Sequence, residues 1–528
     1  MRWLVFLGSI VSASAALAAQ DCESLARLPL PATTITRVES VPAGDFAPPA
    51  GKAIPGLPAF CRVAGAIKPS PDSSIQFEAW MPSSGWNGKF QGTGNGGFAG
   101  SINYDQMGTA VAHGYAAAST DTGHQAGTID AGWALGHPEK ITDFGYRAIH
   151  GMTATAKSIV RAFYGAGPGR SYFSSCSNGG RQALMEAQRY PEDYDGIIAG
   201  APANYWTHLL ANAAWDLLAL LGEKDGYIPA KKLAAIQAAA LAACDALDGV
   251  KDGIIENPSR CHFDPSVLQC EGAETDRCLT APQVIALQKL YAGGRTSGGQ
   301  QVFPGYAPGG EAEPGGWEPW ITGVAPERSL MFGFGTQFFK NMVFDSAAWD
   351  YHTFDVDRDT KAADEKMARI LNATNPDLSR FRAHGGKLIL YHGWSDAAIA
   401  APNTIDYYES VVAKMGSGEA HGFLRLFMVP GMQHCGGGSG PNSFGQFGAG
   451  SGDAQQDMGA ALERWVEQGI APERIVATKR RNDRDPKSEV VRTRPLCAYP
   501  LVARYKGSGS TDDAANFVCA KEETASSR

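Results

Sequence analysis

A serine lies at a sharp corner between two segments of opposite character. Residues 171–175 are strand-like, residues 181–190 are helix-like, and the stretch 175–179, SCSNG, joins them. Such a corner projects the serine hydroxyl above a sheet, provided that the residues two before and two after it are small. The usual pattern is Gly-x-Ser-x-Gly, and here Ser175 replaces the first glycine. The pattern predicts that Ser177 is a nucleophile; the alternative is a glycine-rich turn with an incidental serine.

A nucleophilic serine needs a general base, and the base needs an acid that orients it. Asp396 ends the strand-like segment LILYHGWSD, and His434 lies in the turn after the next strand-like segment, LRLFMVPGMQH. In α/β-hydrolases the chain order is also serine, acid, histidine. His392 lies within a strand, where a buried structural histidine is the simpler interpretation, and His421 precedes a strand, at the wrong end of a parallel sheet. The sequence therefore predicts a triad of Ser177, Asp396 and His434.

Two backbone N–H groups must stabilise the oxyanion that forms during acyl transfer. One usually belongs to the residue after the nucleophile, which is Asn178. The other comes from a loop after an early strand, and the stretch 92–98, GTGNGGF, is the candidate because glycine lets the backbone approach the ester. We expect Gly96 as this donor, with Gly97 as the second choice. A phosphate-binding loop is the alternative, but the stretch lacks the P-loop Gly-Lys-Ser/Thr and a Rossmann acidic residue.

Two of the ten cysteines flank the predicted nucleophile and base. Cys176 directly precedes Ser177, and Cys435 directly follows His434. The other eight fall into local couples, although sequence alone cannot determine connectivity. If Cys176 and Cys435 pair, their Cα atoms lie about 4.4–6.8 Å apart, which ties the base to its nucleophile. The local couples are Cys22 with Cys61, Cys244 with Cys261, Cys270 with Cys278, and Cys497 with Cys519.

Strand-like and helix-like segments alternate on both sides of a long stretch of different composition. The alternation runs over residues 60–205 and resumes at residue 385, which indicates a mostly parallel α/β sheet. The stretch between them lacks it and is dense in aromatic side chains. We therefore expect an α/β fold: an α/β-hydrolase core of residues 20–205 and 376–528, ending in a disulfide-stapled tail, with a large inserted lid domain at 206–375.

An aspartate-rich loop lies within the expected lid. Asp245, Asp248 and Asp252 fall between two cysteines, and carboxylate oxygens together with backbone carbonyls suit Ca²⁺. The spacing is not that of an EF-hand, and a solvated polar turn is the alternative. Because the loop belongs to the lid rather than to the segment around Ser177, calcium there would be structural.

The N-terminus and the overall charge limit where the protein acts and what it binds. Residues 1–19 combine a basic residue, an apolar stretch and small residues, as in a secretory signal peptide. A membrane anchor is the alternative, but the apolar run is short and no second span follows. The net charge is −8 without a long Lys/Arg run, which argues against a nucleic-acid partner. We expect a protein secreted to the periplasm or the medium, with no membrane partner.

The elbow CSNGG at residues 176–180, the acid in GWSD and the pair His434-Cys435 resemble the signature of the tannase and feruloyl esterase family. The resemblance runs from about Cys22 to Cys519. It implies the triad given above, a Cys176–Cys435 bond and disulfides at the four local couples. It also implies a structural calcium site in the lid, with ligands Asp245, Asp248, Asp252 and the carbonyls of Val250 and Ile254.

Members of that family cleave esters of an aromatic acid, and the resemblance implies the same chemistry here. We expect a secreted serine carboxylesterase acting on phenolic esters, of the feruloyl esterase or tannase type, on small molecules or on acyl groups attached to plant polysaccharide. A hydrolase of mono(2-hydroxyethyl) terephthalate is the alternative within the family, but no arginine can be assigned to the second carboxylate. A non-catalytic polyphenol- or carbohydrate-binding protein is the alternative of another class, and an intact triad argues against it.

Aromatic side chains in the expected lid are candidates for setting the acid specificity. They could stack on an aromatic acyl group or form the core of the lid itself, and the sequence favours neither for any one of them. They are Trp317, Trp320, Phe332, Phe334, Phe338 and Phe339.

Overall fold

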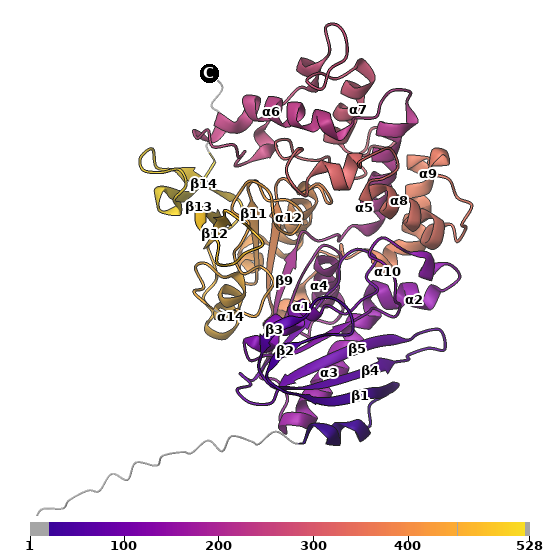
Figure 1. The fold of residues 1–528 in the computed structure, drawn as a ribbon, viewed down its shortest axis with the longest axis vertical. Coiled ribbons are helices and arrows are strands. Elements are labelled where there is room, and N and C mark those ends of the chain that lie inside the picture. Colours follow the sequence, from indigo (N-terminus) through magenta and orange to yellow (C-terminus); the bar gives the residue numbers. More distant parts are fainter. Residues whose placement is uncertain (1–20, 451, 523–528) are drawn as a thin grey trace, which may run out of the picture.

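A nine-stranded mixed sheet forms the centre of the molecule (Figure 1). The structure is a computed structural model that describes residues 21–450 and 452–522, so the expected signal peptide lies outside the described residues. The strand order is β1-β4-β5-β7-β6-β8-β9-β10-β11. The strands are β1 (Thr33–Val41), β4 (Phe60–Ile67), β5 (Ile75–Pro82), β6 (Lys89–Thr93), β7 (Ala116–Thr120), β8 (Arg170–Cys176), β9 (Gly196–Gly200), β10 (Lys387–Gly393) and β11 (Leu424–Val429).

The strands from β7 to β11 in this order run parallel to one another. Cys176 at the end of β8 pairs in register with Gly200 at the end of β9, so parallel strands end at a common edge. The loops that carry the three predicted triad residues follow β8, β10 and β11 and leave the sheet at this edge. At the other side, β1, β4 and β5 pair antiparallel, which the strand–helix alternation did not predict.

Helices cover both faces of the sheet. Leu388 and Leu390 of β10 are fully buried in a hydrophobic core that also contains residues of α3, α4 and α12, whereas Ile389 and Tyr391 of the same strand are buried in a core that contains residues of α1 and α14. Burial of a strand on both faces is typical of parallel sheets between helical layers, the α/β class that the alternation predicts. The helices are α1 (Tyr104–Ala112), α2 (Pro138–Thr142), α3 (Ala148–Tyr164), α4 (Asn178–Arg189), α12 (Pro402–Met415), α13 (Ser417–His421) and α14 (Met458–Gln468).

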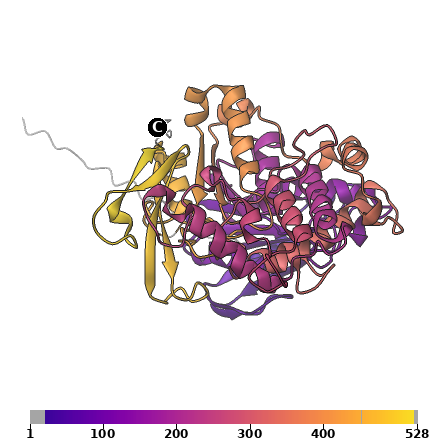
Figure 2. The ribbon, with the colours of Figure 1, turned by 90° about the horizontal axis from the view of Figure 1, so that it is seen from above.

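The chain between β9 and β10, residues 201–386, forms a helical insertion without a β-strand. Figure 1 shows α6 and α7 beyond the ends of the strands, and from above the insertion covers much of the core (Figure 2). No helix within the described ranges is long and apolar enough to cross a membrane. The helices of the insertion are α5 (Trp206–Leu217), α6 (Leu233–Cys244), α7 (Ala281–Ala292), α8 (Leu330–Phe338), α9 (Val356–Ala363), α10 (Arg369–Leu371) and α11 (Ser379–Ala383).

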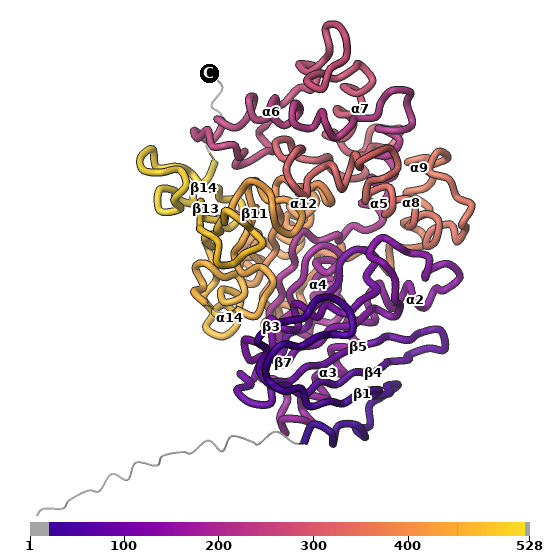
Figure 3. The backbone as a smooth tube through the Cα atoms, in the orientation of Figure 1, coloured from indigo at the N-terminus to yellow at the C-terminus, as the bar shows by residue number. Residues whose placement is uncertain are grey.

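The C-terminal residues form two hairpins that contact the insertion, as the chain trace shows (Figure 3). Arg494 of β13 pairs with Asp252 of the insertion, and Val250 packs against Phe517 of β15. These contacts join the aspartate-rich loop to the end of the chain. The hairpin strands are β12 (Arg474–Arg480), β13 (Val490–Cys497), β14 (Leu501–Tyr505) and β15 (Phe517–Lys521), and a further small hairpin joins β2 (Gly44–Phe46) and β3 (Ile54–Leu57).

Five disulfides cross-link the chain, and none of the cysteines in the described ranges is free. One of them spans 259 residues, whereas the other four close loops of 8 to 39 residues. The pairs are those that the family resemblance implies. They are Cys22–Cys61, Cys176–Cys435, Cys244–Cys261, Cys270–Cys278 and Cys497–Cys519.

Candidate active site

Ser177 occupies the turn between β8 and α4 with a strained backbone. Its φ of 68° and ψ of −128° lie in a region that residues other than glycine rarely adopt. A Cβ at Gly179 would clash with the Ser175 side chain, which explains why both positions carry small residues. Helix α4 begins at Asn178, earlier than the helix expected from residue 181. The corner therefore has the geometry of a nucleophile elbow.

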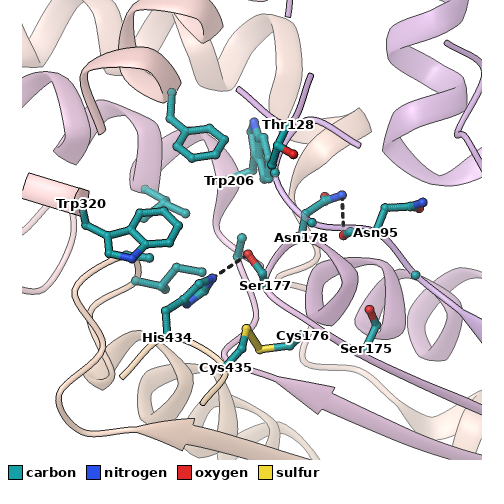
Figure 4. A pocket seen from close by; sticks show the side chains of 18 of the residues that line it. Asn95, Thr128, Ser175, Cys176, Ser177, Asn178, Trp206, Trp320, His434 and Cys435 are labelled. Atoms are coloured by element: carbon teal, nitrogen blue, oxygen red, sulfur yellow. Dashed lines mark hydrogen bonds between the residues drawn. A yellow bond between two sulfur atoms is a disulfide. The ribbon is translucent and has the colours of Figure 1, made fainter. Parts of the chain in front are cut away.

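Hydrogen bonds join the three residues of the predicted triad. His434 Nε2 lies 2.9 Å from the Ser177 hydroxyl oxygen (Figure 4), and His434 Nδ1 lies 2.8 Å from Asp396 Oδ2. Asp396 is buried, and its Oδ1 accepts hydrogen bonds from the amides of Ala398 and Ile399 at 2.8 and 2.9 Å. An imidazole held by a carboxylate in this way can take a proton from the serine hydroxyl.

Two histidines face Asp396, but only His434 reaches the serine. His392 Nε2 lies 3.1 Å from Asp396 Oδ2, and its Nδ1 lies 2.7 Å from the Thr404 hydroxyl. Burial favours a raised pKa for Asp396, but the charge of His434 and the hydrogen bonds from both histidines outweigh it and hold that pKa below its usual range. Asp396 therefore stays ionised beside the imidazole at neutral pH. His421 ends α13 and does not line the cavity above the serine.

The Cys176–Cys435 disulfide joins the elbow to the histidine turn, with the two Cα atoms 6.0 Å apart. Figure 4 shows its sulfur atoms beside the Ser177–His434 hydrogen bond. The bond connects the end of β8 to the loop after β11, which are separated in the sheet by β9 and β10. Two loops from distant strands are thus fixed together at the residues that must meet.

The predicted oxyanion donors lie at the start of α4 and in the glycine-rich loop. Asn178 is the first residue of α4, where a backbone N–H has no partner within the helix. Its side chain is engaged elsewhere, because Nδ2 donates to the Asn95 carbonyl at 3.3 Å and Oδ1 accepts from Arg181 at 2.9 Å. Gly96 and Gly97 line the cavity, and neither amide has a hydrogen-bond partner among the described residues. Their role as oxyanion donors stays a prediction.

The glycine-rich loop and α4 are held in place by three polar residues that the sequence did not single out: Asn95, Gln182 and Arg181. Gln182 Oε1 accepts the Asn95 amide at 3.0 Å, and its Nε2 donates to Asn95 Oδ1 at 3.2 Å. Arg181 is fully buried; burial lowers its pKa to about 9, and it donates to the carbonyls of Phe144 and Gly145. No local signal could have found them, because these partners lie 36 to 87 residues away along the chain.

A cavity of about 330 Å³ opens above Ser177. One side carries the predicted oxyanion donors, and the other is formed by apolar side chains of the helical insertion. Trp320 meets the His434 ring edge-on, with 5.0 Å between the ring centroids. Among the described residues, no lysine or arginine side chain lines the cavity. The apolar wall consists of Trp206, Leu209, Leu210, Trp320, Met331 and Phe334.

The six aromatic residues singled out from the sequence fall into two groups. Trp320 and Phe334 line the cavity and stack on each other, with their ring planes 11° apart. The others do not line it: Phe332 packs against Tyr351 outside the cavity. The remaining three are buried in the hydrophobic core of the insertion and are Trp317, Phe338 and Phe339.

The aspartate-rich loop has the donor chemistry of a calcium site. Asp245 accepts the amide of Asp252 at 3.2 Å, and Asp252 turns one oxygen to Arg494. In the described part of the chain, the carbonyls of Val250 and Ile254 accept no hydrogen bond, which leaves them available as ligands. Three carboxylates and two carbonyls within ten residues are the hard oxygen donors that Ca²⁺ takes. The residue types suit the ion, although the carboxylate oxygens of the three aspartates do not all lie within 4.8 Å of one another in the described structure, and calcium binding stays a prediction.

Known proteins are similar to this chain over nearly its whole length. Residues 61–520 match the family described as "Tannase and feruloyl esterase". An uncharacterized esterase of Xanthomonas campestris pv. campestris is 46% identical, over 98% of this chain and 94% of the relative. The mono(2-hydroxyethyl) terephthalate hydrolase of Piscinibacter sakaiensis is 35% identical, over 92% of this chain and 88% of its own length.

A solved structure also matches the fold of this chain. The crystal structure of feruloyl esterase B from Aspergillus oryzae gives a TM-score of 0.87 at 32% identity, covering 94% of this chain and 99% of that one. The matches confirm the α/β-hydrolase fold and an ester-hydrolysing enzyme, in preference to a non-catalytic binding protein. The chain belongs to the tannase and feruloyl esterase family and is a carboxylic ester hydrolase.

Proposed function

We propose that this chain is a secreted serine esterase that hydrolyses esters of phenolic acids, of the feruloyl esterase or tannase type. The observation that carries the proposal is the hydrogen-bonded chain of Ser177, His434 and Asp396 beneath an apolar, aromatic cavity. Phenolic acyl groups are flat and have apolar faces, which tryptophan and phenylalanine walls such as Trp320 and Phe334 bury well. The similarity to the Aspergillus oryzae feruloyl esterase supports this substrate class.

The reaction follows from the positions of these groups. The Ser177 oxygen attacks the ester carbonyl carbon while its proton passes to His434 Nε2. Asp396, ionised and hydrogen-bonded to Nδ1, stabilises the imidazolium that forms. The amides of Asn178 and Gly96 stabilise the oxyanion. As the carbon–oxygen bond breaks, His434 gives its proton to the departing alcohol and leaves an acyl-enzyme. Water then attacks the acyl-enzyme, and a proton returns through His434 to the serine as the acid leaves.

A terephthalate monoester is the second candidate substrate, because the Piscinibacter sakaiensis relative carries that activity in its name. Terephthalate retains a second carboxylate at the far end of the ring, and a cavity that binds it needs a compensating cation. In the part of the chain that the structure describes, none of the residues that line the cavity is a lysine or arginine. The neutral far end of a feruloyl or galloyl group therefore fits the cavity better.

Replacement of the proposed nucleophile tests the mechanism. Ser177→Ala is expected to abolish turnover of methyl ferulate and methyl gallate and to prevent labelling by a fluorophosphonate probe. The matched control is Ser175→Ala, two residues earlier, which removes a hydroxyl of the same turn and is expected to keep the enzyme labelled. Unchanged hydrolysis by Ser177→Ala would reject the mechanism. A wild-type panel of ferulate, gallate and terephthalate monoesters, compared by kcat/KM, tests the acid class.

We further propose that the helical insertion acts as a lid over the acid-binding cavity, and that Ca²⁺ in its aspartate-rich loop is structural. The loop joins the insertion to the C-terminal hairpins through Asp252 and Arg494, which supports a stabilising role. When bound, the ion would neutralise the clustered carboxylates. We propose that residues 1–19 direct export, and five disulfides support an oxidising compartment.

A further inference from the structure

A cluster of three potential metal ligands lies outside the cavity above Ser177. His150 belongs to α3, Glu186 to α4, and Asp193 to the connection between α4 and β9. One ligand atom of each of these residues lies within 4.8 Å of those of the other two. No other group of three or more histidine, cysteine or acidic side chains in the described ranges meets this condition. Three segments of the chain thus bring a nitrogen and two carboxylates to one place.

Glu186 is the buried member of the cluster, and it lacks a hydrogen-bond donor. It is 1% exposed, and neither of its carboxylate oxygens accepts a hydrogen bond from a described residue. It faces the carboxylate of Asp193; burial and this second carboxylate raise the pKa of Glu186 well above its usual value, although Lys157 opposes the rise. A buried carboxylate without a donor must be neutralised by a proton or by a metal ion. When no metal is bound, Glu186 therefore keeps a proton at a position where a cation is favoured.

The other titratable groups around Glu186 do not balance the two carboxylates. The Lys157 ammonium donates to the backbone carbonyl of Asp193, and burial lowers the pKa of Lys157. Burial also raises the pKa of Tyr190 to about 12 and that of Tyr194 well above its usual value, so both phenols are neutral. Two carboxylates thus share one ammonium, which leaves negative charge for a bound cation to compensate.

His150 provides the nitrogen ligand and the side that is open to water. Its side chain is 39% exposed, and its ring stacks on Tyr190 with 3.8 Å between the ring centroids, which fixes its orientation. His150 Nδ1 lies 2.6 Å from Asp193 Oδ2, and a tetrahedral zinc ion needs its ligand atoms about 3.3 Å apart, so a small opening admits the ion. An imidazole with carboxylates suits Zn²⁺, whereas Ca²⁺ and Mg²⁺ take oxygen ligands.

We propose that His150, Glu186 and Asp193 form a structural zinc site, with water as the fourth ligand. The ion takes the place of the proton on Glu186 and cross-links α3, α4 and the connection to β9. Glu186 follows Ser177 by nine residues, which is about 13 Å along the axis of α4. The site therefore stabilises the helix behind the nucleophile without contacting the ester, and the inference does not depend on the proposed reaction.

Zinc binding is measured with the untagged protein after it has been stripped with a chelator, in buffer with excess Ca²⁺ to saturate the aspartate-rich loop. Calorimetric titration with ZnCl₂ at pH 8 is expected to give one ion per chain, and the thermal midpoint is expected to rise by several degrees. At pH 5.5 the affinity is expected to fall at least about tenfold, because Glu186 then holds its proton. All cysteines of the described ranges form disulfides, so no thiolate there competes for the ion.

Two ligand variants and one matched control locate the binding. His150→Gln and Glu186→Gln are each expected to lower the zinc affinity at least about tenfold at pH 8. Without zinc, Glu186→Gln is expected to be at least as stable as wild type at this pH, so that its loss of binding does not reflect loss of folding. The control is His352→Gln: His352 Nδ1 lies 2.8 Å from Asp350 Oδ1 in an exposed pair that lacks a third ligand among the described residues. It is expected to bind zinc as wild type does.

The outcomes decide the proposal. It is overturned if stripped wild type binds no zinc, if both ligand variants bind zinc as tightly as wild type, or if His352→Gln loses as much affinity as His150→Gln. Anomalous scattering at the zinc edge from crystals soaked in ZnCl₂ gives the position of the ion. A peak between the His150 ring and the two carboxylates supports the site, and peaks at other places alone would overturn it.

Discussion

The disulfide-bonded residues Cys176 and Cys435 are the immediate chain neighbours of Ser177 and His434, and their Cα atoms lie 6.0 Å apart. The 2.9 Å contact between the serine hydroxyl and the histidine therefore depends on a covalent bond as well as on packing.

Removal of this bond is expected to impair chemistry more than folding. In the double variant Cys176→Ala with Cys435→Ala, kcat/KM for methyl ferulate is expected to fall at least about tenfold, because a small displacement of the histidine loop lengthens the proton-transfer contact. The control is the double variant Cys497→Ala with Cys519→Ala, which opens a disulfide of the C-terminal hairpins. Small and equal losses in both would contradict a positioning role.

His392 and His434 both contact Asp396 but are expected to differ in their effect on turnover. His434→Ala removes the base and is expected to lower kcat by about 10⁴ or more. His392→Gln keeps a polar side chain beside Asp396 and Thr404 and is expected to lower kcat by only about tenfold, through a less well oriented carboxylate. Single-turnover kinetics with a chromogenic acetate ester measures both. A comparable loss in the two variants would show that His392 takes part in proton transfer.

Chelation tests the calcium loop. EGTA treatment is expected to lower the thermal midpoint by several degrees, because the clustered carboxylates repel one another without the ion. Asp248→Asn is expected to lower the midpoint in buffer and to make it insensitive to EGTA. Elemental analysis of the untreated protein provides the direct measurement. Absence of calcium together with an unchanged thermal midpoint would reject the proposed calcium site.

Glu186 is expected to make stability depend on pH. It is buried in α4, and burial together with the neighbouring Asp193 carboxylate raises its pKa well above the usual value, with Lys157 opposing the rise. Its contribution to stability is therefore full below about pH 4.5, the unfolded value, and is lost as the pH rises through the folded pKa. Glu186→Gln, which is neutral at every pH, is expected to be more stable than wild type by about 1 kcal/mol or more at pH 8 and much less so at pH 5.

Thermal unfolding at the two pH values checks this expectation. Glu192→Gln is the matched control, since Glu192 is exposed and lies six residues further along the chain. It is expected to show no pH-dependent gain. A gain in Glu186→Gln that is equal at pH 5 and pH 8 would point to packing rather than ionisation.

The triad residues could be predicted because each follows a strand with a local signature. Ser177 lies between a β-like and a helix-like run, and Asp396 and His434 follow apolar strands in the expected order. The antiparallel edge of β1, β4 and β5 was missed because pairing across strands leaves no local pattern that separates it from parallel pairing.

The residues that surround and position the catalytic groups could not be predicted from the sequence, for a related reason. Arg181 looks like an ordinary helix residue, yet it is fully buried because Phe144 and Trp206, from two distant segments, cover it. Trp317 and Trp320 are three residues apart, and only the packing of the insertion decides that the second reaches the cavity. Local sequence can predict which groups do the chemistry, but the residues that surround these groups are brought there by long-range contacts.

The bond between Cys176 and Cys435 closes a ring of the chain that contains the whole helical insertion, residues 201–386. A protease that cuts an exposed loop of the insertion therefore cannot release either fragment. The N-terminal piece carries the serine, the C-terminal piece carries the histidine, and both stay tethered within a few residues of the scissile ester. Such a nicked enzyme would run as one band on a non-reducing gel and as two after reduction. In a protease-rich environment, this disulfide therefore keeps the serine and the histidine together after cleavage of the insertion that covers them.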